Sequence, residues 1–150
     1  MMDLASKLPE LLQKATTWAE GQSEFIMEHG SPLSVTGITD ARVVGVSNPE
    51  AIRVCVVQCL PLPIDNELRT VALETGLLAP NIVGLTLGHG IFIVDGHGTR
   101  RLLSHEFRHV HQYEQAGSIS AFLSVYLSQI ASVGYREAPL EIDARYHEIQ

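Results

Sequence analysis

The chain has 150 residues, of which 45% are hydrophobic and 18% charged, so we expect one folded domain rather than a disordered chain. The formal net charge of -7 has the wrong sign for a phosphate-binding surface, and no basic stripe is present, which argues against a nucleic acid partner. No apolar run approaches the roughly 20 residues that span a bilayer, and the N-terminus shows no secretory signal. We therefore expect a cytoplasmic protein without a membrane partner.

The first helix is expected at residues 8–28, where apolar residues recur at spacings of three and four. Pro9 falls in the first turn of this helix, where proline is well tolerated. Gly30 and Pro32 follow and end the helix. The next segment, residues 35–46, fits either a short helix or a strand.

The clearest strand is expected at residues 52–57, a short segment rich in β-branched residues. Cys55 and Cys59 lie on this apolar stretch at a spacing that would place both on one face of the strand. This position suits neither a disulfide nor a metal site. We interpret both cysteines as small buried hydrophobic residues in a reducing compartment.

The segment between Asp65 and Gly98 predicts a helix followed by extended structure. Asp65 or Asn66 can cap the helix, which ends near Gly76. Residues 82–94 then predict one or two strands with glycines at positions of close approach. A turn follows this extended segment and leads directly into the next helix.

A helix is expected from Thr99 to Gln115, and it contains the pattern H-E-x-x-H as His105, Glu106 and His109. Residues four apart lie above one another on a helix, so two imidazoles at this spacing can occupy adjacent corners of a zinc tetrahedron. Glu106 then lies beside the metal rather than on it, where it can take a proton from zinc-bound water. The same pattern is also found by chance in ordinary surface helices, so a third ligand is needed.

The candidates for the third ligand are His89, His97, His111, Glu137, Glu141, Asp143 and His147. Glu141 is the best placed, because it lies in the first turn of a last helix expected at residues 140–148. A helix expected at residues 119–133 acts as a spacer and returns the chain to the metal site. Asp143 lies about 200° around the last helix from Glu141, so the two cannot both face the metal. The alternative role for Glu141 is a favourable charge at a helix N-terminus.

These residues resemble the gluzincin branch of the H-E-x-x-H zinc metallopeptidases. The resemblance is carried by His105-Glu106-x-x-His109 and, after a helical spacer, Glu141. The chain also resembles short bacterial zincin-like domains of unknown function over residues 68–147. That second resemblance rests on Leu102-Leu103-x-His105-Glu106-x-x-His109-Val110-x-Gln112 and, upstream, Gly84-x-Thr86-x-Gly88-His89-x-Ile91. It implies that His105, His109 and Glu141 bind zinc and that Glu106 is the general base.

The resemblance further implies an α+β, zincin-like fold with a small mixed or antiparallel sheet. We expect a single domain over residues 1–150, with an N-terminal part at residues 1–67 and a metal-site core at residues 68–150. One position departs from the family pattern. Many gluzincins have an aspartate four residues after the ligand glutamate, where it orients a ligand histidine, and here this residue is Arg145. Asp143 or a backbone carbonyl would then take over the orienting role.

Two functions are compatible with these patterns. The first is a zinc metallopeptidase acting on a peptide or protein substrate, with the strand at residues 88–93 pairing with the substrate. The candidates for the donor to the tetrahedral intermediate are Tyr126, Tyr135, His89 and His97. Tyr135 is preferred because it lies in the loop just before Glu141. The second function is a non-catalytic binding or accessory module with a structural or vestigial metal site.

Overall fold

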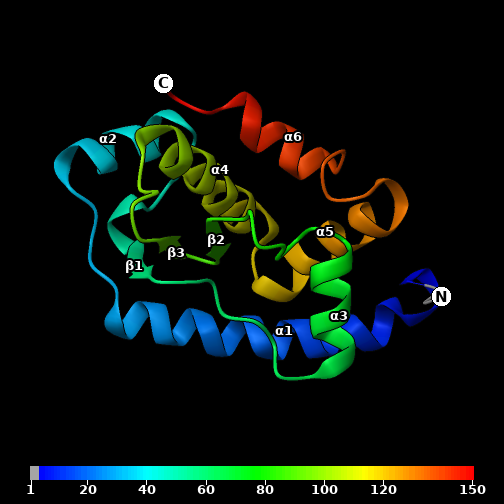
Figure 1. Ribbon diagram of the computed structural model, residues 1–150. Helices are drawn as coiled ribbons and strands as arrows, with labels where there is room; N and C mark the ends of the chain where they lie inside the picture. The colour runs from blue at the N-terminus through cyan, green and yellow to red at the C-terminus, as the bar shows by residue number, and fades with distance from the viewer. Residues whose placement is uncertain (1–3) are drawn as a thin grey trace.

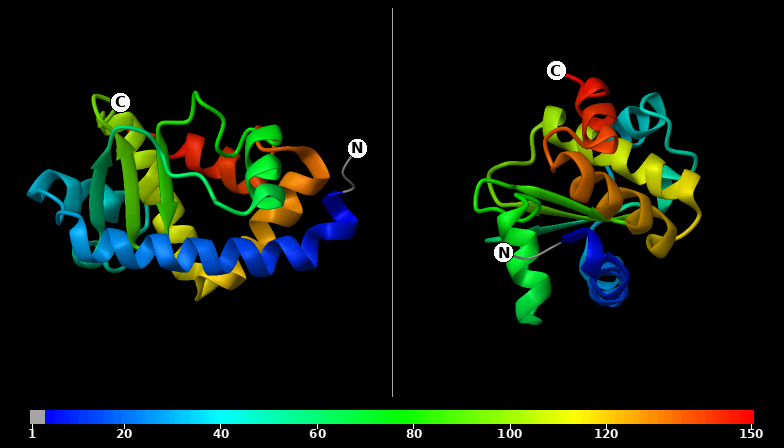
Figure 2. Two further views of the ribbon diagram at one scale, coloured as in Figure 1. Left: turned by 60° about the horizontal axis from the view of Figure 1, so that its bottom comes forward. Right: turned by 90° about the vertical axis from the view of Figure 1, so that its right-hand side faces the viewer.

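The computed structural model describes residues 4–150 and has an α+β architecture (Figure 1). The helices are α1 (Leu4–His29), α2 (Val35–Val43), α3 (Asn66–Glu74), α4 (Arg100–Ala116), α5 (Ile119–Val133) and α6 (Pro139–Tyr146), with a 3-10 turn, η1, at Pro49–Ala51. The strands are β1 (Arg53–Val57), β2 (Gly84–Leu87) and β3 (Gly90–Val94). The sheet lies between α1 on one face and α4 on the other, as the end-on view in Figure 2 shows.

The sheet has the order β1-β3-β2, so β3 is its central strand. β1 runs parallel to β3, whereas β2 runs antiparallel to it through a tight turn in which Gly88 has a φ of +71°. Side chains alternate across β3, so that Phe92 packs toward α1 while Ile91 and Ile93 pack toward α4. The prediction that residues 88–93 offer a free strand edge is therefore wrong, and the edge beside α4 belongs to β2.

In the first half of the chain, the first helix starts earlier than predicted, and the segment at residues 35–46, which fitted either a helix or a strand, begins as a helix. α1 already includes Leu4, so Pro9 lies inside the helix rather than in its first turn. The lost hydrogen bond is tolerated because the following turns bury an apolar face against the sheet. The ambiguous segment at residues 35–46 begins as helix α2, capped by Ser34, whose hydroxyl accepts the N–H of Gly37.

The strand predicted at residues 52–57 is confirmed as β1, but only one cysteine lies on it. Cys55 is half-buried within the strand. β1 ends at Val57, so Cys59 lies beyond it and is exposed. The prediction that both thiols are buried on one face is wrong for Cys59, because the strand is too short to include it.

The helices of the second half match their predicted positions because each has a clear start or stop. α4 has Thr99 as its N-cap and Gly117, in the left-handed conformation with a φ of +94°, as its C-cap. α5 begins directly afterwards with Ser118 as its N-cap. α6 starts at Pro139, a residue that suits the first turn of a helix.

No single helix within residues 4–150 is long and apolar enough to cross a membrane. α4 and α5 have that length and apolar composition only when taken together, and they are bent by 114° relative to one another. The buried residues of α5, which pack inside the protein, are Phe122, Leu123, Tyr126 and Ile130.

Candidate metal centre

The structure brings the three predicted ligands together between α4 and α6. His105 Nε2 lies 3.2 Å from Glu141 Oε1, and His109 Nε2 lies 3.0 Å from Glu141 Oε2. One ligand atom from each residue can be chosen so that all lie within 4.8 Å of one another. In a zinc tetrahedron with bonds of about 2.0–2.2 Å, neighbouring ligand atoms are roughly 3.3 Å apart. The two histidine–glutamate distances are already close to this value, whereas ligand atoms as far as 4.8 Å apart would have to approach by up to about 1.5 Å to bind one ion.

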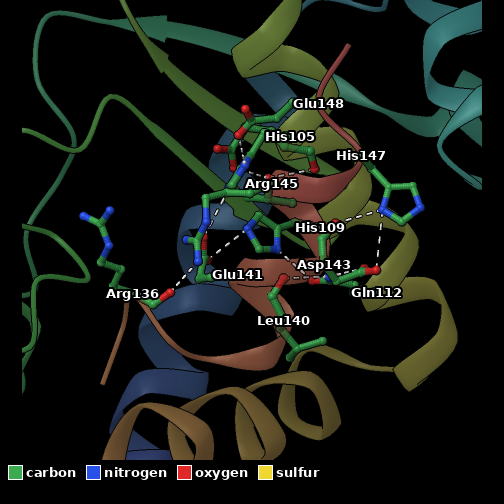
Figure 3. A network of polar contacts seen from close by, with 12 residues as sticks. His105, His109, Gln112, Arg136, Leu140, Glu141, Asp143, Arg145, His147 and Glu148 are labelled. Atoms are coloured by element: carbon green, nitrogen blue, oxygen red, sulfur yellow. Dashed lines mark hydrogen bonds and ion pairs between the residues drawn. The ribbon is translucent and has the colours of Figure 1, made fainter. Parts of the chain in front are cut away.

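The local sequence explains why these residues meet. His105 and His109 are one turn apart on α4, and their rings lie edge to face with centroids 5.0 Å apart. α5 and the loop after it connect α4 to α6. Glu141 lies in the first turn of α6 and faces the two rings (Figure 3). Gln129 fixes the start of α6, because its side-chain oxygen accepts the N–H of Leu140 at 3.0 Å.

Each histidine has a separate partner for its second ring nitrogen. His105 Nδ1 contacts Glu148 Oε2 at 2.9 Å, and His109 Nδ1 contacts Gln112 Oε1 at 2.7 Å (Figure 3). The amide nitrogen of Gln112 donates to the carbonyl of Leu140 and to Asp143, which leaves its oxygen to accept from His109. These contacts direct both Nε2 atoms toward Glu141.

The expected orienting groups are therefore wrong in detail. Asp143 bonds to Arg108 and Gln112 and acts on His109 only through Gln112. No backbone carbonyl takes the role for either ligand ring within the described residues, because side chains occupy both Nδ1 atoms. Arg145 is directed away from the histidines and donates to the carbonyl of Arg136.

Contact with Glu141 determines the charges in the cluster. Burial by itself lowers the pKa of His109, but the carboxylates of Glu141 and Glu106 raise it to about 9. Burial likewise opposes a charged His105, and hydrogen bonding to Glu141 together with the charge of Glu106 leaves its pKa raised. Burial would raise the pKa of Glu141, but the two histidines hold it well below its usual range. The carboxylate of Glu141 thus favours protonated rings, and Zn²⁺, which suits this set of oxygen and nitrogen donors, would displace those protons on binding.

Glu106 points into the same site without joining the ligand group. Its carboxylate accepts the hydroxyl of Thr86 at 2.7 Å, and the residue is only 4% exposed. Gly84 leaves room for the other carboxylate oxygen, since a Cβ there would lie 2.8 Å from Glu106 Oε2. Thr86 and Gly84 both belong to β2, so this edge strand holds the carboxylate of Glu106 beside the three candidate ligands.

Two tyrosines from the predicted donor set also face the cluster. Tyr126 is buried and donates its hydroxyl to Glu141 Oε2 at 2.7 Å, so it holds a predicted ligand. Tyr135 is half-buried and lines the same cavity as Glu106 and Glu141. Burial, followed by the charges of those two carboxylates, raises the pKa of Tyr135, which keeps its phenol protonated. Tyr135 as the donor to the reacting oxygen stays a prediction.

The remaining candidates lie elsewhere. His89 pairs with Glu114 at 3.0 Å, and His111 Nδ1 contacts the carbonyl of Gly45 at 2.8 Å. His147 contacts the carbonyl of Asp143, while His97 and Glu137 are exposed. Thr86 and Gln112 belong to the sequence patterns that carry the resemblance, but those patterns assign them no role, and Glu148 is in neither pattern. Gln112 lies one helical turn after His109, which is a local signal for its contact with that ring.

Comparison of the chain with family models, with curated proteins and with solved structures gives no match. The features of the site that bear on function are its donor set, the burial of the cluster and the position of Glu106.

Proposed function

We propose that the protein is a zinc-dependent hydrolase with a zincin-like fold, most simply a peptidase, in which His105, His109 and Glu141 hold the metal. The observation that carries this proposal is the position of Glu106. Its carboxylate is buried, is held by Thr86 and lines the same cavity as the three ligands. A purely structural metal site has no use for a fourth ionisable group that is positioned beside the ligands but not among them.

Zinc, when bound, polarises a scissile carbonyl and lowers the pKa of a water molecule to about 7. Glu106 then acts as the general base, taking a proton from the attacking water and passing it to the leaving nitrogen. Glu148 and Gln112 keep the histidine Nε2 atoms directed at the metal. The edge strand β2 pairs with the extended substrate.

Tyr135 completes the proposed machinery as a hydrogen-bond donor. The developing negative charge on the former carbonyl oxygen needs a donor positioned in advance. Tyr135 lines the cavity from the loop before α6, whereas the hydroxyl of Tyr126 is already engaged with Glu141. Tyr135→Phe is therefore expected to lower kcat more than it changes KM.

A second function is supported by the way the cluster joins two helices. His105 and His109 belong to α4 and Glu141 belongs to α6, so a metal ion would hold these helices together without any catalysis. The protein would then act as a binding or accessory module. The two functions make different predictions for Glu106, which only the hydrolase requires.

The test begins with metal content, measured on protein purified without added zinc and on the His105→Ala variant. We expect about one zinc per chain in the first and a large loss in the second. The zinc-loaded protein and its Glu106→Gln variant are then incubated with a mixture of dye-labelled peptides. Glu106→Gln should keep its zinc and lose about 10²–10⁴-fold in the rate of hydrolysis.

Three results would count against the hydrolase. They are no zinc even after zinc is supplied, no hydrolysis of any peptide by the zinc-loaded protein, and equal hydrolysis by the Glu106→Gln variant. If the protein binds zinc, loses it in the His105→Ala variant and yet hydrolyses no peptide, the result would favour the structural metal site.

A further inference from the structure

Two arginines beside the proposed site have no acidic partner, although the protein has 17 acidic residues against 10 lysines and arginines. Neither Arg136 nor Arg145 forms an ion pair with any of residues 4–150, and the exposed Glu137, which directly follows Arg136, pairs with neither of them. The basic side chains that do pair with a carboxylate are Lys7, Lys14, Arg42, Arg100, Arg101 and Arg108. The positive charge of the two unpaired guanidinium groups is therefore available to an anionic ligand.

The unpaired arginines lie next to the cavity that contains the proposed base. Arg145 is one helical turn after Glu141 on α6, so the two side chains leave the same face of this helix. Its guanidinium donates from Nη2 to the carbonyl of Arg136, and Figure 3 shows the side chain reaching from α6 to that loop. Arg136 directly follows Tyr135, which lines the cavity together with Glu106 and Glu141. Both arginines are exposed, so they lie where this part of the cavity wall meets solvent.

The charge of Arg145 reaches the proposed site. Burial and then the carboxylates of Glu141 and Glu106 raise the pKa of Tyr135, whereas the charge of Arg145 acts on this pKa in the opposite direction. The interaction between two charges falls with distance and is screened by solvent, so this influence requires a guanidinium close to the phenol. The site thus has a positive charge on the side of Tyr135, the residue proposed as hydrogen-bond donor.

The ordinary roles of a basic residue at a helix end explain only part of this arrangement. Arg145 lies in the last turn of α6, where a positive charge is favourable, and it bonds to a backbone carbonyl. Neither role requires a second arginine on the neighbouring loop, and the Arg136 side chain makes no hydrogen bond within the described residues. A guanidinium has five N–H donors, so the contact with the carbonyl leaves enough of them for the two parallel bonds that a carboxylate accepts.

We infer that Arg145, supported by the charge of Arg136, binds a carboxylate of the substrate next to the bond that is cut. This assignment rests on the proposed hydrolase function and names a substrate class for the same site. Residues four apart on a helix are about 5–6 Å apart, and an extended chain advances about 3.3–3.6 Å per residue. The carboxylate would therefore lie roughly one or two residues from the cut bond. It is either the free C-terminus of the substrate or an aspartate or glutamate side chain, because both present the same anionic group.

Binding is tested without catalysis on the Glu106→Gln variant, both with zinc and with a chelator. The probes are dye-labelled peptides of one sequence, made as the free acid and as the C-terminal amide, and two amidated peptides that differ only by glutamate or glutamine. We expect a carboxylate peptide to bind about 10-fold more tightly than its neutral counterpart. This is the lower end of the range for a hydrogen bond to a charged group, because Arg145 is exposed. A preference seen only with zinc would place the carboxylate on the metal and overturn the assignment.

The zinc-loaded wild type is then assayed with the same four peptides, and mass spectrometry locates the cut. The kcat/KM of a carboxylate peptide should be about 10-fold above that of its neutral counterpart. Arg145→Gln should bring this ratio close to one, and Arg145→Lys should give an intermediate ratio, because lysine keeps the charge but not the planar fork. A purely structural role would instead lower both rates alike. Arg42→Gln, which changes an exposed arginine on α2, is the matched control and should keep the ratio.

A preference for the free acid over the amide identifies the C-terminal carboxylate, and a preference for glutamate over glutamine identifies an acidic side chain. Either one supports the assignment if Arg145→Gln loses it. Hydrolysis without such a preference, or with one that Arg145→Gln keeps, overturns the assignment while the hydrolase stands. Selective binding that Arg145→Gln loses, without hydrolysis of any peptide, supports the carboxylate site and overturns the hydrolase.

A second variant covers the case in which Arg145→Gln does not fold. Arg136→Gln removes the other positive charge at a side chain that makes no hydrogen bond within the described residues. It should lower the same kcat/KM ratio by about 2–3-fold, the size expected for an exposed charge. An unchanged ratio in Arg136→Gln would then overturn the assignment.

Discussion

The carboxylate of Glu106 is positioned by two residues of β2, one of which donates a hydrogen bond while the other leaves space. Thr86 supplies a hydroxyl donor at 2.7 Å from one oxygen. Gly84 supplies space, because any Cβ at that position would lie 2.8 Å from the other oxygen and 3.1 Å from the carboxyl carbon. A small residue and a donor, two positions apart on one strand, therefore fix the same side chain.

Gly84→Ala should displace Glu106 and leave the metal ligands in place. Because a shift of about 1 Å in a catalytic group costs on the order of 10²-fold, we expect kcat to fall by about that factor with unchanged zinc content. Peptide hydrolysis and metal analysis on the same preparation check this. Gly98→Ala is the matched control, since a Cβ there meets only Ile93 at an ordinary 3.8 Å. An unchanged kcat in Gly84→Ala would contradict the assignment of Glu106 as the base.

Glu148 orients His105 and should therefore influence zinc affinity. Loss of such an orienting partner typically weakens metal binding by about 10–100-fold, which is the effect expected for Glu148→Ala in a competition titration with a chelator. Glu148→Gln keeps an acceptor oxygen and should lose less. Arg101, which pairs with Glu148 and is 67% exposed, serves as the control, because Arg101→Ala should have little effect. Normal affinity in Glu148→Ala would show that His105 is oriented by another group.

At the scale of elements, the C-terminal end of α4 is hydrogen-bonded to the segment before β1. Glu114 Oε1 accepts the N–H of Ser47 at 2.7 Å, and Oε2 accepts the N–H of Asn48 at 3.0 Å. His89, in the turn between β2 and β3, contacts the same carboxylate. One side chain thus connects α4 to two loops, which keeps α4 in register with the sheet.

Replacement of Glu114 by Ala should lower the free energy of unfolding by about 1–3 kcal/mol, because two backbone N–H groups lose their acceptor. Burial would raise the pKa of Glu114, but the N–H groups and His89 hold it below its ordinary value of 4.5. A carboxyl with a lowered folded-state pKa stabilises above its unfolded pKa, and this stability is lost as the pH falls through the folded value.

The difference in urea stability between the wild type and the Glu114→Gln variant should therefore be largest near neutral pH and should shrink below about pH 4.5. Glu50→Gln is the control, since Glu50 and its partner Arg42 are both more than half exposed and contribute little. A difference that grows on acidification would contradict the proposed anionic role of Glu114.

At the scale of the whole molecule, the cluster joins helices that are distant in sequence. α4 packs on the sheet, and α6 is attached to α4 by Glu141 at one point and by the Asp143–Arg108 ion pair at another. α6 lies on the side of α4 away from the sheet (Figure 1). Strengthening the Glu141 contact should stabilise the protein, because this contact is one of those that join α6 to α4.

Zinc should therefore raise the melting temperature of the protein. At a free zinc concentration of about 100 times the dissociation constant, the expected stabilisation is about 2.7 kcal/mol. The effect should decline as the pH falls below about 9, the raised pKa of His109, because protonation then competes with the metal for this histidine. Differential scanning calorimetry with and without a chelator measures it, and His105→Ala should abolish it. A zinc-induced shift that persists in His105→Ala would place the metal elsewhere.

Local signals in the sequence were sufficient to predict the positions of most helices and to select the three candidate ligands. α4, α5 and α6 could be placed because caps and stop residues such as Thr99, Gly117 and Pro139 act within one turn of the chain. The spacing of His105 and His109 fixes their common face, since helix geometry is local. Glu141 could be chosen because Pro139 fixes the first turn of its helix.

Only the tertiary structure decided the rest. The strand order places β3 in the centre and β1 and β2 at the two edges. Local signals do not determine this order, because strand pairing joins residues far apart in the chain. Glu148 lies beyond the last helix and reaches His105 only after the chain folds back, and Thr86 reaches Glu106 only through sheet–helix packing. The cavity beside Glu106 and Glu141 is the clearest case, since its walls come from six separate elements, α1, α3, β2, α4, α5 and α6, and no single segment contains a sign of it. Spacing along one helix fixes which donors share a face, whereas the shape around them depends on contacts between distant segments.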